Sequence, residues 1–187
     1  MSSFAVHLSV FPDQCSLFLQ PLSHMADVNK SNLRNKTGIL PKDACVVVVK
    51  TEWNAAIVDE LEKGCIGKLK ELGAKKIVSL TVPGAVEIPF AIRNYWQHQK
   101  KKKTPDVFIA LGCVIRGGTP HFEYVCKSVT EGIVQLNLLL SVPTIFGILT
   151  VDSEEQARDR IGGRHGHKGE EAAITAVKMI LLKKQFE

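Results

Sequence analysis

The sequence lacks two features that would define broad classes of protein. No apolar run comes close to the roughly 20 residues that a membrane-spanning helix needs, so we expect no membrane partner. No pair of cysteines has the spacing of metal ligands, and the five are far apart, at Cys15, Cys45, Cys65, Cys113 and Cys126. Their odd number, and the apolar or helical surroundings of three of them, indicate reduced thiols. This predicts a cytoplasmic protein without a metal site.

No aromatic residue interrupts the most basic stretch of the chain, the four lysines at 100–103. A site for single-stranded nucleic acid would need aromatic rings on which the bases can stack. The formal net charge is only +5, and much of it lies in this stretch. We therefore interpret the lysines as a solvated loop and expect no nucleic-acid partner.

Residues 1–24 contain neither lysine nor arginine and show no helical or strand period. They therefore fit neither a secretory signal nor an Arg-rich transit peptide. Met25 is a plausible start, so this segment is either a disordered tail or a start site placed too early. We expect an N-terminal extension at 1–40, disordered at 1–24, followed by one domain at 41–187.

From Cys45 onward, short apolar runs alternate with longer helical patterns. Strands are predicted at 45–49, 76–80, 107–111 and 144–149, and helices at 55–72, after 83–84, at 120–140, from Ser153 and from about Gly169. Gln156 lies three residues after Ser153, which predicts a capping box at that helix start. This alternation predicts an α/β fold, a three-layer α/β/α sandwich with a four-stranded parallel, flavodoxin-like sheet.

In an open parallel sheet, ligands bind beyond the carboxyl ends of the strands, where two segments of unusual composition follow the first two strands. At 51–54, Trp53 is either a core or interface residue or a flat surface for a stacked heterocycle. Asn54 has a simpler explanation as a helix N-cap. At 82–89, a Pro-Gly bend exposes backbone amides, and Glu87 falls in a first helical turn, where the helix dipole alone could explain it.

The third segment, residues 112–121, ends a strand in a Gly-Gly turn that lets the backbone approach a ligand closely. Thr119 suits the N-cap and Pro120 the first helical position. Free amides at a helix start bind anions, which places a phosphate at Gly118 and Thr119. The helix dipole favours a neutral His121 that accepts a proton, although such a histidine can also be an incidental surface residue.

The fourth segment, residues 158–169, combines glycines with basic side chains, among them Arg160 and Lys168. It predicts a flexible basic hinge between the last two helices. Arginine can hold phosphate through two parallel hydrogen bonds. A Walker loop is excluded because the spacing of its glycines and lysine is not met.

Together the four segments resemble the lumazine synthases, and residues 45–187 carry the resemblance. The strings at 112–122, 124–125, 146–150 and 155–157 are the most specific. The resemblance implies that 5-amino-6-(D-ribitylamino)uracil is condensed with 3,4-dihydroxy-2-butanone 4-phosphate to 6,7-dimethyl-8-ribityllumazine, the penultimate step of riboflavin biosynthesis. It implies no metal and no redox cofactor.

The resemblance also assigns roles by position. It implies that the pyrimidine and its ribityl chain bind to residues of the first three segments: Trp53 by stacking, with Asn54 beside it; Ala85, Val86 and Glu87 along the ribityl chain; and Cys113, Val114 and Ile115 at the pyrimidine edge. It implies that the phosphate substrate and the proton transfer use a second set: Gly118 and Thr119 with Arg160 and Lys168 at the phosphate, Phe146 as a pocket wall, and His121 as the proton-transfer residue.

Three positions depart from the family pattern. Trp53 replaces the commoner Phe, Val86 replaces what is often an aromatic or polar residue, and His167 stands where Asn is common. Two other classes of function remain as alternatives. A non-catalytic flavin-binding or scaffold protein would be favoured by loss of His121 or Arg160, and both are present. A flavodoxin-like electron carrier would need a hydroxyl-rich loop after the first strand.

The resemblance further implies assembly. The active site is expected between neighbouring subunits of a pentamer, with Phe146 and the region from Arg160 to Lys168 contributed by the other subunit. The short connection at 162–169 predicts that the pentamers join into an icosahedral capsid, whereas Trp53 is a feature of some free pentamers. Riboflavin synthase is a candidate protein partner.

Overall fold

The computed structural model describes residues 40–41, 43–99 and 104–187. Four strands form one parallel sheet in the order β2-β1-β3-β4: β1 (Cys45–Thr51), β2 (Lys76–Val82), β3 (Val107–Ile115) and β4 (Thr144–Val151). The helices of the sandwich are α1 (Ala55–Glu71), α2 (Ile88–His98), α3 (His121–Leu139) and α5 (Lys168–Lys183). The three-layer α/β/α fold expected from the sequence is therefore confirmed.

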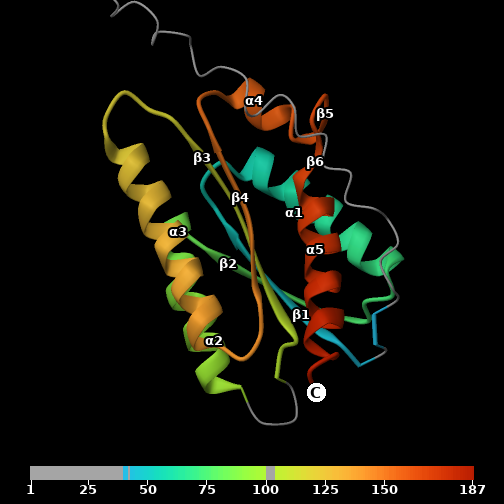
Figure 1. The fold of residues 1–187 in the computed structure, drawn as a ribbon. Coiled ribbons are helices and arrows are strands. Elements are labelled where there is room, and N and C mark those ends of the chain that lie inside the picture. The colour runs from blue at the N-terminus through green and yellow to red at the C-terminus, as the bar shows by residue number, and fades with distance from the viewer. Residues whose placement is uncertain (1–39, 42, 100–103) are drawn as a thin grey trace, which may run out of the picture.

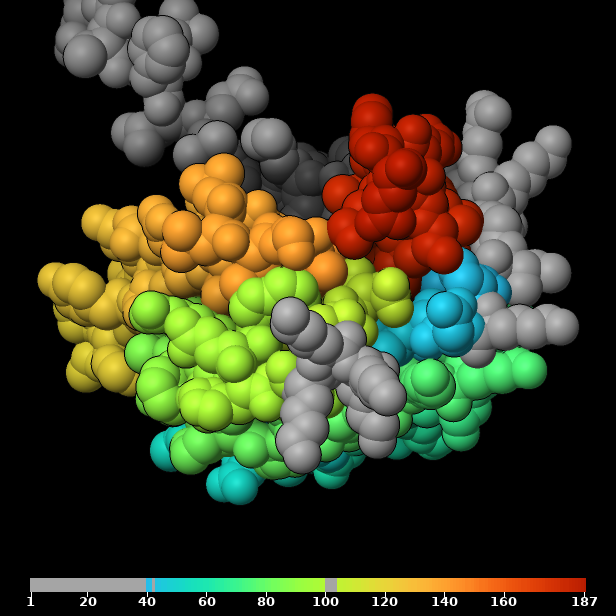
Figure 2. Space-filling view, turned by 90° about the horizontal axis from the view of Figure 1, so that it is seen from below, coloured from blue at the N-terminus to red at the C-terminus, as the bar shows by residue number. Residues whose placement is uncertain are grey.

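Two helices cover each face of the sheet (Figure 1). α1 and α5 lie on one face and α2 and α3 on the other, while α4 (Glu154–Arg158) lies near the end of β4. Figure 2 shows the molecule from below the view of Figure 1. At this end the red end of α5, the orange segment and the cyan start of β1 lie close together. Segments that are distant in sequence thus lie side by side at this end.

The core is divided by β1, whose valines point alternately to the two faces. Val46 and Val48 pack among residues of α1 and α5, whereas Val47 and Val49 pack among residues of α2 and α3. All four are fully buried. Since burial of one such side chain contributes about 1.5–3 kcal/mol, this strand is a large part of the hydrophobic stabilisation.

The strands extend further toward their carboxyl ends than the apolar runs predicted. β3 was expected to end at Leu111 and continues to Ile115, because its pairing with β4 extends to Val151. The predicted disorder at 1–24 and the solvated lysines at 100–103 lie outside the described residues. Within the described ranges, no helix is both long and apolar enough to cross a bilayer.

The starts of α4 and α3 can be compared with the caps predicted at Ser153 and Thr119. The Ser153 hydroxyl accepts a hydrogen bond from the Gln156 backbone N–H at 3.2 Å, as the capping box requires. The Gln156 side chain reaches back to the Asp152 N–H, one residue earlier than in the standard motif. The prediction that Thr119 is an N-cap is wrong, because α3 begins at His121 with Pro120 as its N-cap.

The predicted flexible hinge at 158–169 is also wrong. This segment forms an antiparallel hairpin, β5 (Ile161–Gly163) and β6 (Gly166–His167), between α4 and α5. Gly166 has a φ of 78°, a conformation that side chains disfavour, so its glycine serves the tight turn of the hairpin. The basic side chains therefore stand on a defined structure.

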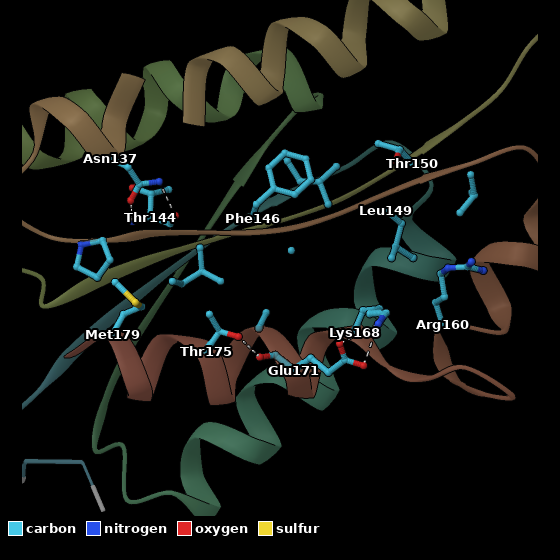
Figure 3. A pocket seen from close by; sticks show the side chains of 16 residues that line it. Asn137, Thr144, Phe146, Leu149, Thr150, Arg160, Lys168, Glu171, Thr175 and Met179 are labelled. Carbon is cyan, nitrogen blue, oxygen red and sulfur yellow. Dashed lines mark hydrogen bonds and ion pairs between the residues drawn. The ribbon is translucent and has the colours of Figure 1, made fainter. Parts of the chain in front are cut away.

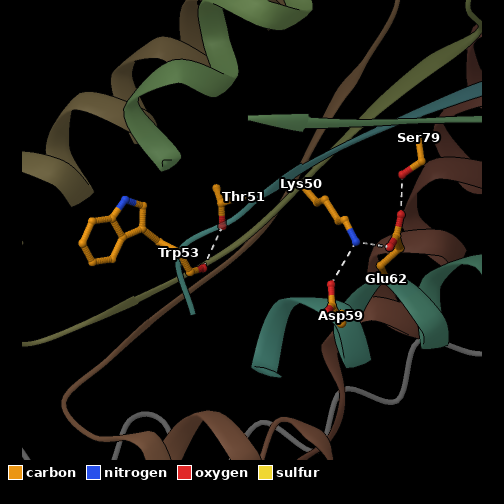
Figure 4. Close-up of polar contacts among 6 residues, drawn as sticks. All are labelled: Lys50, Thr51, Trp53, Asp59, Glu62 and Ser79. Carbon is orange, nitrogen blue, oxygen red and sulfur yellow. Dashed lines mark hydrogen bonds and ion pairs between the residues drawn. The ribbon is translucent and has the colours of Figure 1, made fainter. Parts of the chain in front are cut away.

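A polar cluster joins the end of β1 to α1 (Figure 4). The Lys50 ammonium donates to Glu62 at 2.6 Å and to Asp59 at 2.9 Å, and the Ser79 hydroxyl of β2 donates to the other oxygen of Glu62. The two hydrogen bonds that Lys50 donates, the one to Glu62 first, raise the pKa of Lys50. The Lys50 and Glu62 side chains are only 19% and 16% exposed, so the pair is shielded from solvent.

Removal of Glu62 should therefore destabilise the fold, because Lys50 would keep its charge without its main partner. We expect Glu62→Ala to lower the free energy of unfolding by about 1–3 kcal/mol. Glu60→Ala, on the same helix, removes only an exposed ion pair with Lys63 and should cost at most about 0.5 kcal/mol. Urea denaturation of both variants at equal protein concentration measures the difference, and equal losses would contradict the role of the cluster.

Candidate active site

Most of the residues predicted from the sequence line two separate hollows, and Gly118 and Thr119 lie in a third. The first, here called the strand-end pocket, has a volume of about 500 Å³ and lies beyond the ends of β1 and β3. Its walls include Trp53, Asn54, the short helix η1 (Ala85–Glu87), residues 113–115 and His121. The second, the β4–α5 groove, has a volume of about 610 Å³ and contains Phe146, Arg160 and Lys168.

Trp53 stands on a rigid turn at the rim of the strand-end pocket. Its backbone N–H donates to the Pro83 carbonyl at 3.2 Å, and its carbonyl accepts from the Thr51 hydroxyl at 3.2 Å. Thr51 itself is buried. The indole is nevertheless 73% exposed, so it is not a core residue (Figure 4). Its fixed backbone and open ring suit a stacking surface for a planar molecule.

Asn54 links two strand ends. Its backbone has a left-handed φ of 59°, which asparagine tolerates better than most residues. Asn54 is the N-cap of α1 by position, as predicted, but its side chain makes no capping hydrogen bond. Its amide instead donates to the Cys113 carbonyl at 2.8 Å. Asn54 therefore fixes the distance between the end of β1 and the end of β3 across the pocket.

Cys113, Val114 and Ile115 bring the edge of β3 to the pocket, with the Cys113 side chain only 4% exposed. Burial, with a smaller contribution from the charge of Glu154, raises the pKa of the Cys113 thiol to about 11. This thiol is therefore neutral near pH 7 and is no nucleophile. The main-chain N–H and C=O groups are therefore the main polar groups that this strand end offers to the pocket.

The turn between β3 and α3 carries the predicted anion site. At both Gly117 and Gly118 the space where a side chain would begin is open, so the backbone is accessible from outside. Gly118 and Thr119 lie in a shallow hollow with Arg116 and Glu123. The Arg116 guanidinium bonds to Asp152 at 2.7 Å and to Glu123, and stacks over Phe122 at 4.1 Å. Sequence reasoning missed this link, which joins the start of α3 to the end of β4.

The β4–α5 groove gathers the remaining candidates (Figure 3). Phe146 stands on β4 with its ring 41% exposed, and Arg160 lies between α4 and β5. The Arg160 guanidinium donates to the Gln156 carbonyl at 2.8 Å. Lys168 pairs with Glu171 at 2.8 Å, a partner that sequence reasoning missed although its i,i+3 spacing indicates it.

Within one chain, His121 is thus kept apart from Arg160 and Lys168. The strand-end pocket and the β4–α5 groove share no lining residue, and they contain His121 and Arg160 respectively. Within the described ranges, no three His, Cys, Asp or Glu side chains are placed to hold a metal ion.

Comparison with known proteins points to a single family. Residues 43–184 match the family model of 6,7-dimethyl-8-ribityllumazine synthase. A protein of that name from Parabacteroides distasonis is 47% identical over 71% of this chain and 82% of its own length. Those of Flavobacterium psychrophilum and Bacteroides fragilis are 44% and 46% identical, over 86% and 71% of this chain and 84% and 92% of their own lengths.

The neutral Cys113 thiol leads to a testable expectation. Cys113→Ser preserves the backbone and approximate side-chain size, so the variant should retain most of its turnover. Because no thiolate forms near neutral pH, the rate profiles of the variant and the parent should run parallel between pH 6.5 and 8.5. Initial rates across that range test this, and a rise with pH that occurs only in the parent would show that a Cys113 thiolate takes part.

Proposed function

The chain belongs to the 6,7-dimethyl-8-ribityllumazine synthase family, and we propose that two copies of it build each active site. The reaction condenses 5-amino-6-(D-ribitylamino)uracil with 3,4-dihydroxy-2-butanone 4-phosphate, releasing phosphate and water. It is the penultimate step of riboflavin biosynthesis. The remaining question is how the residues of this chain divide the work.

We assign the pyrimidine substrate to the strand-end pocket. The exposed indole of Trp53 offers a face to the ring, and Asn54 holds the two strand ends at the separation that a planar ring would enter. The main chain at 113–115 supplies polar groups for the ring edge, and Ala85, Val86 and Glu87 line the side where the ribityl chain would lie. Val86 is 44% exposed, so it contributes an apolar surface there.

We assign the phosphate of the second substrate to cationic and amide groups from two places. The accessible turn at Gly118 and Thr119 lies two to three residues before His121 in the sequence. Arg160 and Lys168 provide positive charge in the groove, with Phe146 as its apolar wall. Departing phosphate is stabilised by such preorganised donors, so these residues would act on the leaving group as well as on binding.

The bond-forming step requires modest chemistry from the protein. The aryl amine of the pyrimidine attacks the ketone carbonyl, and the nitrogen must lose protons while the carbonyl oxygen gains them. His121 lines the pocket at the first turn of α3, where its imidazole can move these protons. Most of the remaining acceleration would come from holding the two substrates together.

The division of the candidate residues into two hollows is the observation that supports a shared site. Neither hollow in one chain contains both the proton-transfer residue and the two phosphate-binding cations. β4 is an edge strand, and Phe146, Leu138 and Leu139 expose apolar surface on β4 and α3. A neighbouring copy that covers this surface would bring its groove to the pocket, and closed rings are a common way to do so.

We propose a pentamer as the ring, and an icosahedral capsid built from pentamers because the connection between α4 and α5 is short. The hairpin from Ile161 to His167 occupies most of that connection. Riboflavin synthase as a partner and the cytoplasm as the compartment stay predictions.

The catalytic assignment is tested by two substitutions. His121→Ala should lower kcat by about 10²-fold, the low end for a general base, because imine formation can also use solvent. Arg160→Ala should mainly raise the KM for the phosphate substrate. Formation of the lumazine is followed by its fluorescence, with the fold checked by circular dichroism. An Arg160→Ala enzyme with an unchanged KM for that substrate would show that the phosphate lies elsewhere.

The shared site is tested by mixing the two impaired proteins and assaying them at a concentration of the phosphate substrate well below the KM of Arg160→Ala. If each site takes His121 from one copy and Arg160 from its neighbour, dissociated and reassembled mixtures of His121→Ala and Arg160→Ala will contain some intact sites. We therefore expect activity to return on mixing, up to about a quarter of the parent value from random pairing of neighbours. Light scattering measures the assembly in parallel. A monomer refutes the shared site, and a free pentamer refutes only the capsid.

A further inference from the structure

The imidazole of His167 lies flat against the backbone of α1 at Gly64. A side-chain carbon built on Gly64 would overlap three atoms of this ring, Cε1, Nε2 and Nδ1. Only glycine leaves room for the ring at this position, which we call the Gly64 notch. The contact joins α1 to the hairpin, because His167 is the last residue of β6 and the N-cap of α5.

A second close approach fixes the start of α5 on the same side of α1. Gly169 is buried, and a side-chain carbon there would collide with the backbone carbonyl of Leu61. Leu61 and Gly64 are three residues apart on α1, so they lie on one face of that helix. The hairpin end and the beginning of α5 are therefore held at two adjacent points.

The hairpin couples the position of His167 to the positions of Arg160 and Lys168. His167 pairs with Ile161 across the hairpin, and the Lys168 N–H donates to the Arg160 carbonyl at 2.8 Å. Arg160 directly precedes β5 and Lys168 directly follows β6. A shift of the backbone at His167 would therefore also shift the backbone from which both cations project.

The imidazole of His167 is held by packing rather than by hydrogen bonds. Its Nδ1 is buried and makes no hydrogen bond within the described part of the chain. The side chain of His167 therefore contributes volume and a flat face rather than a directed polar contact. That property distinguishes it from a residue retained for its hydrogen bonds, and it gives the position a specific test.

We propose that His167 is a positioning residue, which sets the placement of Arg160 and Lys168 through its seat in the Gly64 notch and so determines affinity for the phosphate-bearing substrate. This inference rests on the proposed phosphate site. Since a misplacement of 1 Å can cost up to ~10²-fold, loss of the seat is expected to raise the KM for that substrate by about 10-fold. The KM for the pyrimidine and kcat should change little.

The experiment changes each of the two residues that meet in the notch, His167 and Gly64. His167→Ala removes the ring, and Gly64→Ala expels it without altering His167. His167→Phe keeps a flat ring without nitrogen atoms and should retain a KM close to that of the parent. The matched control is Gly67→Ala on the same helix, where nothing lies within 4 Å of the added carbon and no change in KM is expected.

The double variant tests whether the two residues act through one contact. If they do, Gly64→Ala combined with His167→Ala should be no worse than the more affected single variant, because the new methyl group occupies space that the ring has left. The double variant also provides a test if one of the single variants does not fold. Multiplied KM effects in the double variant, equal increases in the KM of both substrates, or a loss of thermal stability without any change in KM would each overturn the proposal.

Arg160→Ala, measured in the same series, separates this inference from the proposed function. If Arg160→Ala leaves the KM for the phosphate substrate unchanged, the phosphate site itself is misplaced. If Arg160→Ala raises that KM while the His167 and Gly64 variants do not, the phosphate site stands and only the positioning role of His167 fails.

Discussion

Burial of β1 on both faces is the constraint on which the rest of this structure depends. The four valines at 46–49 point alternately into the two cores, so a shift of one residue would exchange their environments. With β1 fixed, its parallel neighbours must end at the same edge. Trp53, Asn54 and the end of β3 meet there because their strands do, and the Asn54 amide then fixes their separation through the Cys113 carbonyl.

Much of this arrangement could be predicted, because it depends on local patterns. Continuous apolar runs indicate buried strands, and the Ser153–Gln156 spacing located a helix start that the structure confirms. The errors arose where distant contacts decide the outcome. Glycines and basic residues at 158–169 indicated flexibility, yet the pairing of β5 with β6 orders them. Asn54 suits a helix cap by type, but its partner lies 59 residues away.

The candidate site shows a similar limit. Residue types and spacing made His121 and the turn at 117–119 candidates, and the family resemblance added Arg160, since each has a chemical role that can be stated locally. They could not show that one chain places His121 in one hollow and Arg160 in another. That separation depends on where β4 lies in the sheet. Because β4 is an edge strand, its outer side is available to a second copy of the chain, whereas β1 and β3 each have a strand on both sides.

The charges in the site favour a mechanism governed by position. Burial keeps the Cys113 thiol neutral, and Lys168 is already paired with Glu171, so neither supplies a free reactive charge before substrate binds. In the proposed site, a bound phosphate would compete with Glu171 for Lys168, and its advantage would then depend on how well Arg160 and the turn at Gly118 are aligned with it. In such a site small displacements matter more than the intrinsic acidity of any group. Close contacts such as that of His167 with Gly64 are therefore suited to hold Arg160 and Lys168 in place.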